Sequence, residues 1–223
     1  MSSDPLPFLP YGRQTITEAD FAAVQSVLRS AFLTQGPKVQ AFEQAVAAKV
    51  HAQFGVAVNS ATSALHIACL ALGLGPGDRL WTSPITFVAS ANCARYCGAE
   101  VDFVDIEPST GLMSMAELET KLQNAERKGT LPKVVVPVHL TGSSCDVEAI
   151  GLLAKRYGFV VLEDASHAIG GRYQGGPVGN CQHSSITVFS FHPVKIITTG
   201  EGGAALCKNT RLARRMQLFR SHG

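Results

Sequence analysis

Several features that mark other classes of protein are missing from this chain of 223 residues. Its first ten residues contain no basic stretch followed by an apolar core, so we expect neither a signal peptide nor a membrane span. The net charge of +2 gives no reason to expect a nucleic-acid or membrane partner. The cysteines form no C-x-x-C pair, and although Cys93 and Cys97 stand one helical turn apart, no second ligand pair follows at zinc spacing. We therefore expect buried thiols, no metal site and a reducing, cytoplasmic compartment.

Two common phosphate-binding motifs are also missing. No G-x-G-x-x-G follows an apolar run, which disfavours a nicotinamide-binding fold. The glycines between residues 200 and 203 do not match G-x-x-x-x-G-K-[ST], so they do not form a phosphate loop of that kind.

Apolar runs alternate with amphipathic stretches along most of the chain, and 46% of the residues are hydrophobic, enough for a sizeable core. This alternation predicts an α/β fold, in which a mostly parallel sheet is sandwiched by helices. The expected strands are 54–59, 79–82, 101–105, 133–139, 159–163, 186–190 and 204–207. The expected helices are 17–30, 37–50, 60–72, 87–96, 115–126, 147–157 and a last one after residue 207.

Three polar segments stand out against this pattern. Asn59-Ser60-Ala61-Thr62-Ser63 joins a strand to a helix, and Asp164 ends the apolar run 159–164. Lys195 lies between Ser190-Phe191-His192 and the glycines 200–203. Because ligands of open parallel sheets gather at the carboxyl ends of the strands, we expect the three segments to share one site.

The residue types in these segments fit pyridoxal phosphate. Unpaired amides at a helix N-terminus suit a phosphate, to which Thr62 and Ser190 can add hydroxyl donors. A strand-end carboxylate such as Asp164 can hold the pyridine nitrogen protonated. The amine of Lys195 can form a Schiff base with the aldehyde and, once displaced, move a proton. Taken singly, Lys195 is more simply a surface lysine and Ser60 an ordinary N-cap, whereas Asp164 is equally a cap or loop carboxylate; their order favours the site.

At these residues the chain resembles the DegT/DnrJ-type nucleotide-sugar aminotransferases of the fold-type I pyridoxal phosphate superfamily. The resemblance runs from Leu9 to Gly223, and its motifs are Leu33-Thr34-Gln35-Gly36-Pro37, Asn59 to Leu65, Gly75-Pro76-Gly77-Asp78, Glu163 to Ala168 and Ser190 to Gly203. Within the family, the aminotransferases of pseudaminic acid biosynthesis are most similar, at Pro10 to Gln14, Thr82 to Ala89 and Phe189 to Gly203.

The resemblance implies transfer of an amino group from an amino acid, with glutamate the expected donor, to a UDP-linked 4-keto-6-deoxy sugar. It also implies a homodimer with each active site at the subunit boundary. The alternatives are a fragment that binds pyridoxal phosphate but is catalytically incomplete, a dehydratase-like relative, or an unrelated α/β binding domain. Since the similar dehydratases replace the lysine with histidine, Lys195 favours transamination.

The resemblance also assigns residues. Lys195 matches the Schiff-base lysine, Asp164 the partner of the pyridine nitrogen, and His167 the residue near the phenolic oxygen. The further cofactor positions are Ala61, Thr62 and Ser190 at the phosphate, Phe87 stacked on the ring and Ser166 on its other face. Thr34, Gly36 and His192 are expected near the sugar. Phe87 and His167 also fit as ordinary core residues, and Gly36-Pro37 as a helix start.

The resemblance further implies a domain organisation. We expect residues 1–35 to form an N-terminal arm and helix, and residues 36–223 to form the large domain that binds pyridoxal phosphate. Members of the family continue past this point into a smaller C-terminal domain, which we expect to be missing here.

Overall fold

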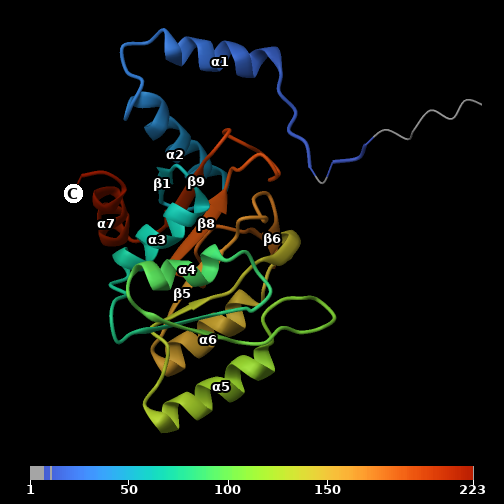
Figure 1. Cartoon of the computed structure of the whole chain (residues 1–223), viewed down its shortest axis with the longest axis vertical. Helices are drawn as coiled ribbons and strands as arrows, with labels where there is room; N and C mark the ends of the chain where they lie inside the picture. Colours follow the sequence, from blue (N-terminus) through green and yellow to red (C-terminus); the bar gives the residue numbers. More distant parts are fainter. Residues whose placement is uncertain (1–7, 11, 223) are drawn as a thin grey trace, which may run out of the picture.

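The computed structural model describes residues 8–10 and 12–222. A seven-stranded sheet crosses the middle of the molecule (Figure 1). Its strand order is β1-β9-β8-β5-β4-β2-β3. Its strands are β1 (Phe54–Val58), β2 (Arg79–Thr82), β3 (Glu100–Phe103), β4 (Val134–Val136), β5 (Val160–Asp164), β8 (Ile186–Ser190) and β9 (Gly203–Cys207). Only β9 runs antiparallel to its neighbours, β1 and β8, so the predicted mostly parallel sheet is confirmed.

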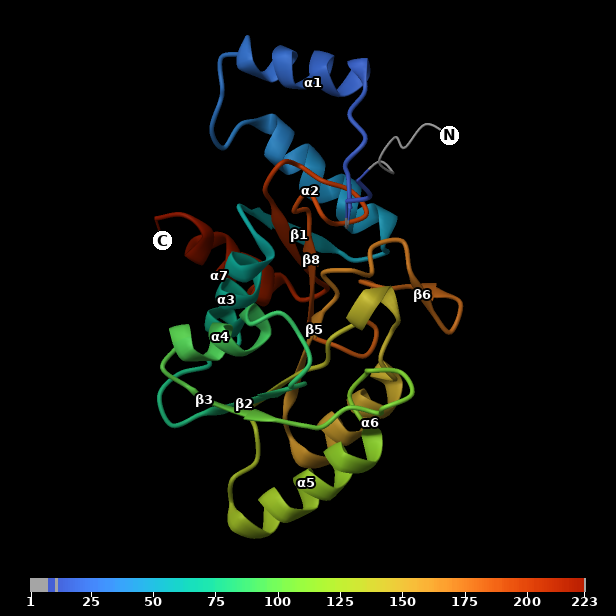
Figure 2. The ribbon, with the colours of Figure 1, turned by 45° about the vertical axis from the view of Figure 1, so that its right-hand side comes forward.

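Helices cover both faces of the sheet, as predicted (Figure 2). One face packs against α3 (Ala61–Ala71), α4 (Ala89–Tyr96) and α7 (Thr210–Arg220). The other packs against α5 (Met115–Lys128) and α6 (Val147–Tyr157). Beside β1, α2 (Pro37–Lys49) buries Val46 and Ala47 against Phe189 and Leu206. Full burial of one such large apolar side chain stabilises the fold by about 1.5–3 kcal/mol, so these clusters hold the strand ends in place.

The helix that opens the predicted site is held by a cap at its start and by buried residues along its length. Ser60 follows β1 and accepts a hydrogen bond from the amide of Ser63 at 3.1 Å, which caps the start of α3. Leu65 and Ala68, within the helix, are completely buried under the sheet. The first turn of α3 is therefore anchored at the carboxyl end of β1.

By contrast, α1 (Glu18–Leu28) buries none of its residues and lies at the edge of the molecule beyond α2 (Figures 1 and 2). It begins after Thr17, whose amide donates to the carboxylate of Asp20 over 2.7 Å.

Residues 1–7 and 11 of the predicted arm, and Gly223 of the predicted large domain, lie outside the described residues. The division at residue 35 stays a prediction.

Several predicted boundaries were wrong. The helix expected from Phe87 begins at Ala89, which leaves Phe87 in the preceding loop. The strand expected over 133–139 ends at Val136, because Pro137 has no amide to donate to a neighbouring strand. The short elements β6 (Arg172–Tyr173), β7 (Gly176–Pro177) and η1 (Leu140–Gly142) were not predicted, since two or three residues show no periodicity.

Within residues 8–10 and 12–222, no helix combines the length and apolar character needed to cross a membrane. The same residues contain no cluster of three or more His, Cys, Asp or Glu side chains suited to a metal ion. All six cysteines are free thiols, and five of them are buried as expected. Cys97 is half-buried, because it follows the last turn of α4.

Candidate active site

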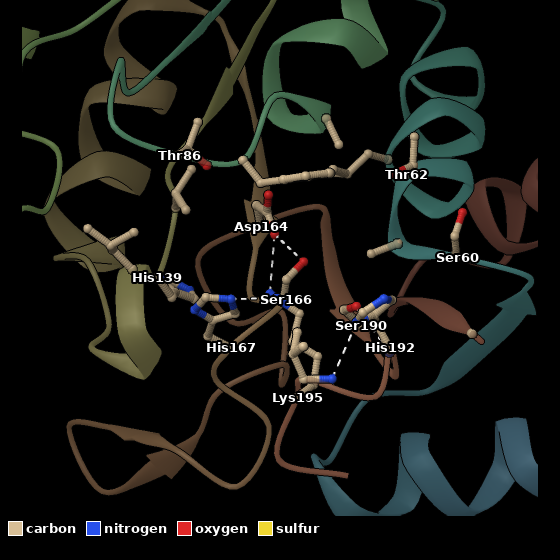
Figure 3. A pocket seen from close by; sticks show the side chains of 18 of the residues that line it. Ser60, Thr62, Thr86, His139, Asp164, Ser166, His167, Ser190, His192 and Lys195 are labelled. Carbon is tan, nitrogen blue, oxygen red and sulfur yellow. Dashed lines mark hydrogen bonds between the residues drawn. The ribbon is translucent and has the colours of Figure 1, made fainter. Parts of the chain in front are cut away.

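A cavity of about 320 Å³ opens where β5 and β8 end and α3 begins (Figure 3). Every predicted cofactor residue lines it: Ala61, Thr62, Phe87, Asp164, Ser166, His167, Ser190 and Lys195. His192, predicted near the sugar, lines it as well. The structure thus brings together segments that are more than a hundred residues apart in the sequence, although each individual role stays a prediction.

Gly203 determines how closely these segments approach. As the first residue of β9 it pairs with Val58 of β1 on one side and with Ser190 of β8 on the other. A Cβ atom on Gly203 would lie 2.4 Å from the carbonyl carbon of Ser60 and 2.5 Å from the amide nitrogen of Ala61. Because no side chain fits there, glycine is required for the start of α3 to lie against the end of β8 and the start of β9.

The start of α3 forms the first part of the site. The amides of Ala61 and Thr62 belong to the first helical turn, so the helix itself offers them no acceptor. The aligned peptide dipoles add partial positive charge at the same point. Ser190, only 6% exposed, lines the cavity beside them. This arrangement suits a phosphate dianion.

Asp164 forms the second part, at the carboxyl end of β5. Its side chain is only 4% exposed, so the charge needs hydrogen bonds to offset the loss of water. Oδ1 accepts from the amide of Ser166 at 3.2 Å and from its hydroxyl at 2.6 Å (Figure 3). Oδ2 accepts from the hydroxyl of Ser90 at 2.6 Å. The carboxylate is therefore held in one orientation at the cavity wall.

Lys195 and His167 form the third part. Nζ of Lys195 lies 2.5 Å from Nε2 of His167. Burial lowers the pKa of Lys195, and the carboxylate of Asp164 partly opposes this shift. Burial also lowers the pKa of His167, as does the charge of Lys195, again with Asp164 opposing. A neutral His167 can accept a hydrogen bond from Lys195, and a lowered pKa makes the lysine a better nucleophile at neutral pH.

The comparison with known families agrees with this geometry. The model of the DegT/DnrJ/EryC1/StrS aminotransferase family matches residues 14–223. The chain belongs to this family. Enzymes of the DegT/DnrJ/EryC1/StrS family depend on pyridoxal phosphate, which is the cofactor predicted from the sequence.

Individual relatives are also similar. The chain is 38% identical over 216 residues to the UDP-4-amino-4-deoxy-L-arabinose–oxoglutarate aminotransferase of Shewanella sediminis, covering 97% of this chain and 53% of that protein. Helicobacter pylori PseC, an aminotransferase of pseudaminic acid biosynthesis, is 35% identical with a TM-score of 0.89, covering 96% of this chain and 56% of that one. The PLP-form of the putative sugar aminotransferase Spr1654 from Streptococcus pneumoniae is 31% identical with a TM-score of 0.84, covering 94% and 57%. The chain spans about half the length of these relatives.

Two predicted substrate residues of this family member lie away from the cavity. Thr34 is exposed and Gly36 is half-buried in the loop between α1 and α2, and neither lines the cavity. His192 stands at the rim, where its Nε2 lies 3.9 Å from Oε1 of Glu201. The roles of all three residues stay predictions.

Sequence reasoning missed a buried pair of which one member, His139, lines the cavity. His139 is 1% exposed, and its Nε2 lies 2.7 Å from Oε2 of Glu163. The amide of Cys145 donates to Nδ1 at 3.1 Å, so the ring proton is on Nε2 and faces the carboxylate. The amide of His139 in turn donates to the carbonyl of Asp164 at 2.9 Å. This pair therefore fixes the end of β5. Glu163 stood in a quoted motif and His139 at the end of an expected strand, but no local pattern indicated that they pair.

Proposed function

We propose that this chain is the cofactor-binding part of an aminotransferase that acts on nucleotide sugars with pyridoxal phosphate. The main support is the single cavity that contains the amine of Lys195, the carboxylate of Asp164 and the first turn of α3. These groups match the aldehyde, the pyridine nitrogen and the phosphate of the cofactor. The close approach at Gly203, which leaves no room for a side chain beside the phosphate subsite, is a second point of fit.

Each protein group has a definite task in this proposal. The bound cofactor supplies an aldehyde that accepts amines and a ring that withdraws electrons from the substrate carbon. Nζ of Lys195 would hold the cofactor covalently and, as a free amine, would take a proton from the substrate carbon. Asp164 holds the proton on the pyridine nitrogen. His167 orients the lysine amine through their hydrogen bond, and the exposed ring of Phe87 covers one cofactor face.

For the substrate, we propose a UDP-linked 4-keto-6-deoxy sugar, with glutamate as amino donor. The name of the Shewanella relative supports the UDP carrier, the amino group at carbon 4 and the exchange with oxoglutarate. Arabinose is a pentose, so the 6-deoxy part of the proposal depends on the likeness to the pseudaminic acid enzyme. Similar relatives are named aminotransferases, which favours transamination over a dehydratase-like reaction.

The remaining parts of the proposal concern assembly and location. We propose a homodimer in which residues 36–223 bind the cofactor and α1 lies at the subunit boundary. The apolar residues Phe21, Val24 and Leu28 of α1 are all exposed, which supports a partner at this helix. Six free thiols support a reducing, cytoplasmic location.

Covalent trapping tests the function directly. The protein is loaded with pyridoxal phosphate, reduced with borohydride and mapped by peptide mass spectrometry. We expect a pyridoxyl group on Lys195, loss of visible absorbance in Lys195→Arg, and no change in Lys208→Ala, which removes an exposed lysine outside the cavity. A label on another lysine, with Lys195 unmodified, would rule out the proposed site.

A further inference from the structure

Ser90 is completely buried in the first turn of α4, yet its hydroxyl reaches the carboxylate of Asp164, 74 residues away in the sequence. The distance between Ser90 Oγ and Asp164 Oδ2 is 2.6 Å, which is typical of a hydroxyl that donates to a charged acceptor. Thr86 lies behind it, with Oγ1 3.0 Å from Ser90 Oγ. The three side chains form a continuous chain of hydrogen bonds that ends at the cavity.

The donors and acceptors in this chain can be assigned. Asp164 accepts three hydrogen bonds, which fits the ionised carboxylate, a group that has no proton to donate. The single proton of the Ser90 hydroxyl is therefore directed at Oδ2. Thr86 must then be the donor to Ser90. Hydrogen bonds aligned in this way polarise and strengthen one another.

The same count shows which oxygen is still open. A carboxylate oxygen has two lone pairs. Oδ1 already accepts from both the amide and the hydroxyl of Ser166, whereas Oδ2 accepts only from Ser90. One acceptor position remains on Asp164, and it is on the oxygen that Ser90 contacts.

We propose that Ser90 is a positioning residue that acts through Asp164: its hydrogen bond turns the open lone pair of Oδ2 toward the ring nitrogen of the cofactor. This inference rests on the proposed function, because it needs pyridoxal phosphate in the cavity. Phe87 lies between Thr86 and Ser90 in the chain and lines the same cavity. The hydrogen bonds from Thr86 through Ser90 to Asp164 thus also connect the loop that carries Phe87, proposed to cover the cofactor ring, with the carboxylate proposed to bind the ring nitrogen.

The test compares Ser90→Ala with Ser83→Ala. Ser83 is equally buried, but its hydroxyl has no hydrogen-bond partner among the described residues, so the control removes the same atom without touching Asp164. Two quantities are measured: the dissociation constant for pyridoxal phosphate, and the ¹⁵N chemical shift of a ring-labelled cofactor. We expect Ser90→Ala to bind about tenfold more weakly, in line with the loss of a hydrogen bond to a charged group, and to shift the ¹⁵N signal toward the unprotonated ring. Ser83→Ala should match the wild type in both.

A cofactor analogue with carbon in place of the ring nitrogen separates positioning from a general structural role. Ser90→Ala should bind this analogue as well as the wild type does, and should add little to the loss caused by Asp164→Asn. Ser90→Cys, which keeps a similar shape and a weaker donor, should lie between serine and alanine and provides the comparison if Ser90→Ala does not fold.

Two outcomes would overturn the inference while leaving the proposed function intact. One is an unchanged ¹⁵N shift and affinity in the Ser90 variants, with the wild type labelled at Lys195. The other is an equal loss of affinity for the cofactor and the carbon analogue. A wild-type protein that fails to bind pyridoxal phosphate at Lys195 would overturn the proposed function, and the inference with it.

Discussion

Nζ of Lys195 lies 2.5 Å from Nε2 of His167, within a cavity that also contains the carboxylate of Asp164. Burial lowers the pKa of the lysine and Asp164 raises it, so the two effects oppose each other. Asp164→Asn removes the raising effect. We therefore predict that Asp164→Asn lowers the pKa of Lys195 further and increases its neutral fraction at pH 7.

This shift is measured on the cofactor-free protein by the pH dependence of reductive methylation, with peptide mass mapping of Lys195. The profile for Asp164→Asn should move to lower pH relative to the wild type. Glu201→Gln is the control, because it removes another carboxylate lining the same cavity that does not contribute to the shift of Lys195. A shift to higher pH, or equal shifts in both variants, would contradict the assignment.

Asp164→Asn should also weaken cofactor binding. The substitution keeps the shape of the side chain but removes the charge that, in the proposed site, holds the ring nitrogen protonated. Loss of a charge-assisted hydrogen bond of this kind costs roughly 1.5–3 kcal/mol. An absorbance titration gives the dissociation constant, and stopped-flow mixing with glutamate gives the rate of the first half-reaction. If both values equalled those of the wild type, Asp164 would be an ordinary strand-end carboxylate.

The sequence predicted the parts of the site that depend on local order. Asp164 was found because it ends an apolar strand and Lys195 because it follows one, and strand ends in a parallel sheet share one edge. The contact between Ser90 and Asp164 was not predictable in this way, because it depends on how α4 packs over the sheet rather than on a local motif. The role of Gly203 was not predictable for a similar reason. The sequence shows only a glycine, whereas the structure shows that the backbone of Ser60 and Ala61 lies where a side chain would begin.

Gly203→Ala should damage the proposed phosphate subsite without removing any polar side chain. The added Cβ would lie within 2.5 Å of Ala61 N, so the start of α3 must move. Overpacking of this kind costs about 1–3 kcal/mol of folding free energy, and the displaced amides should also bind phosphate less well. Urea unfolding and the dissociation constant for pyridoxal phosphate measure the two effects. Gly75→Ala is the control, since its Cβ would meet no atom within 4 Å; a similar loss in both variants would contradict this role.

The protein should be a dimer whose contact includes α1. Phe21, Val24 and Leu28 share one exposed side of this helix, and Ser26 lies on the opposite side. Phe21→Asp removes one large apolar side chain from each subunit, which should weaken association about a hundredfold if each contributes about 1.5 kcal/mol. Sedimentation over a range of concentrations measures this, with Ser26→Asp as the control. A wild-type monomer with bound, ordered cofactor would show that the apolar side of α1 needs no second copy.

A polypeptide of residues 1–223 alone should bind pyridoxal phosphate but turn over slowly. Binding needs the first turn of α3, Asp164, Ser190 and Lys195, and the structure places all of these around one cavity. Rapid turnover also needs the substrate held in place and water excluded, yet Phe87 on the cavity wall is 72% exposed. Misplacement of the reacting groups by about 1 Å can cost on the order of a hundredfold in rate, so an open cavity wall should cost at least as much.

To test this, the polypeptide is mixed with glutamate and a UDP-4-keto-6-deoxy sugar. Cofactor absorbance and the amount of aminated sugar are followed, with Lys195→Arg as the blank. Turnover at about 10 per second, a typical enzyme rate, would show that these residues close the site without further covering.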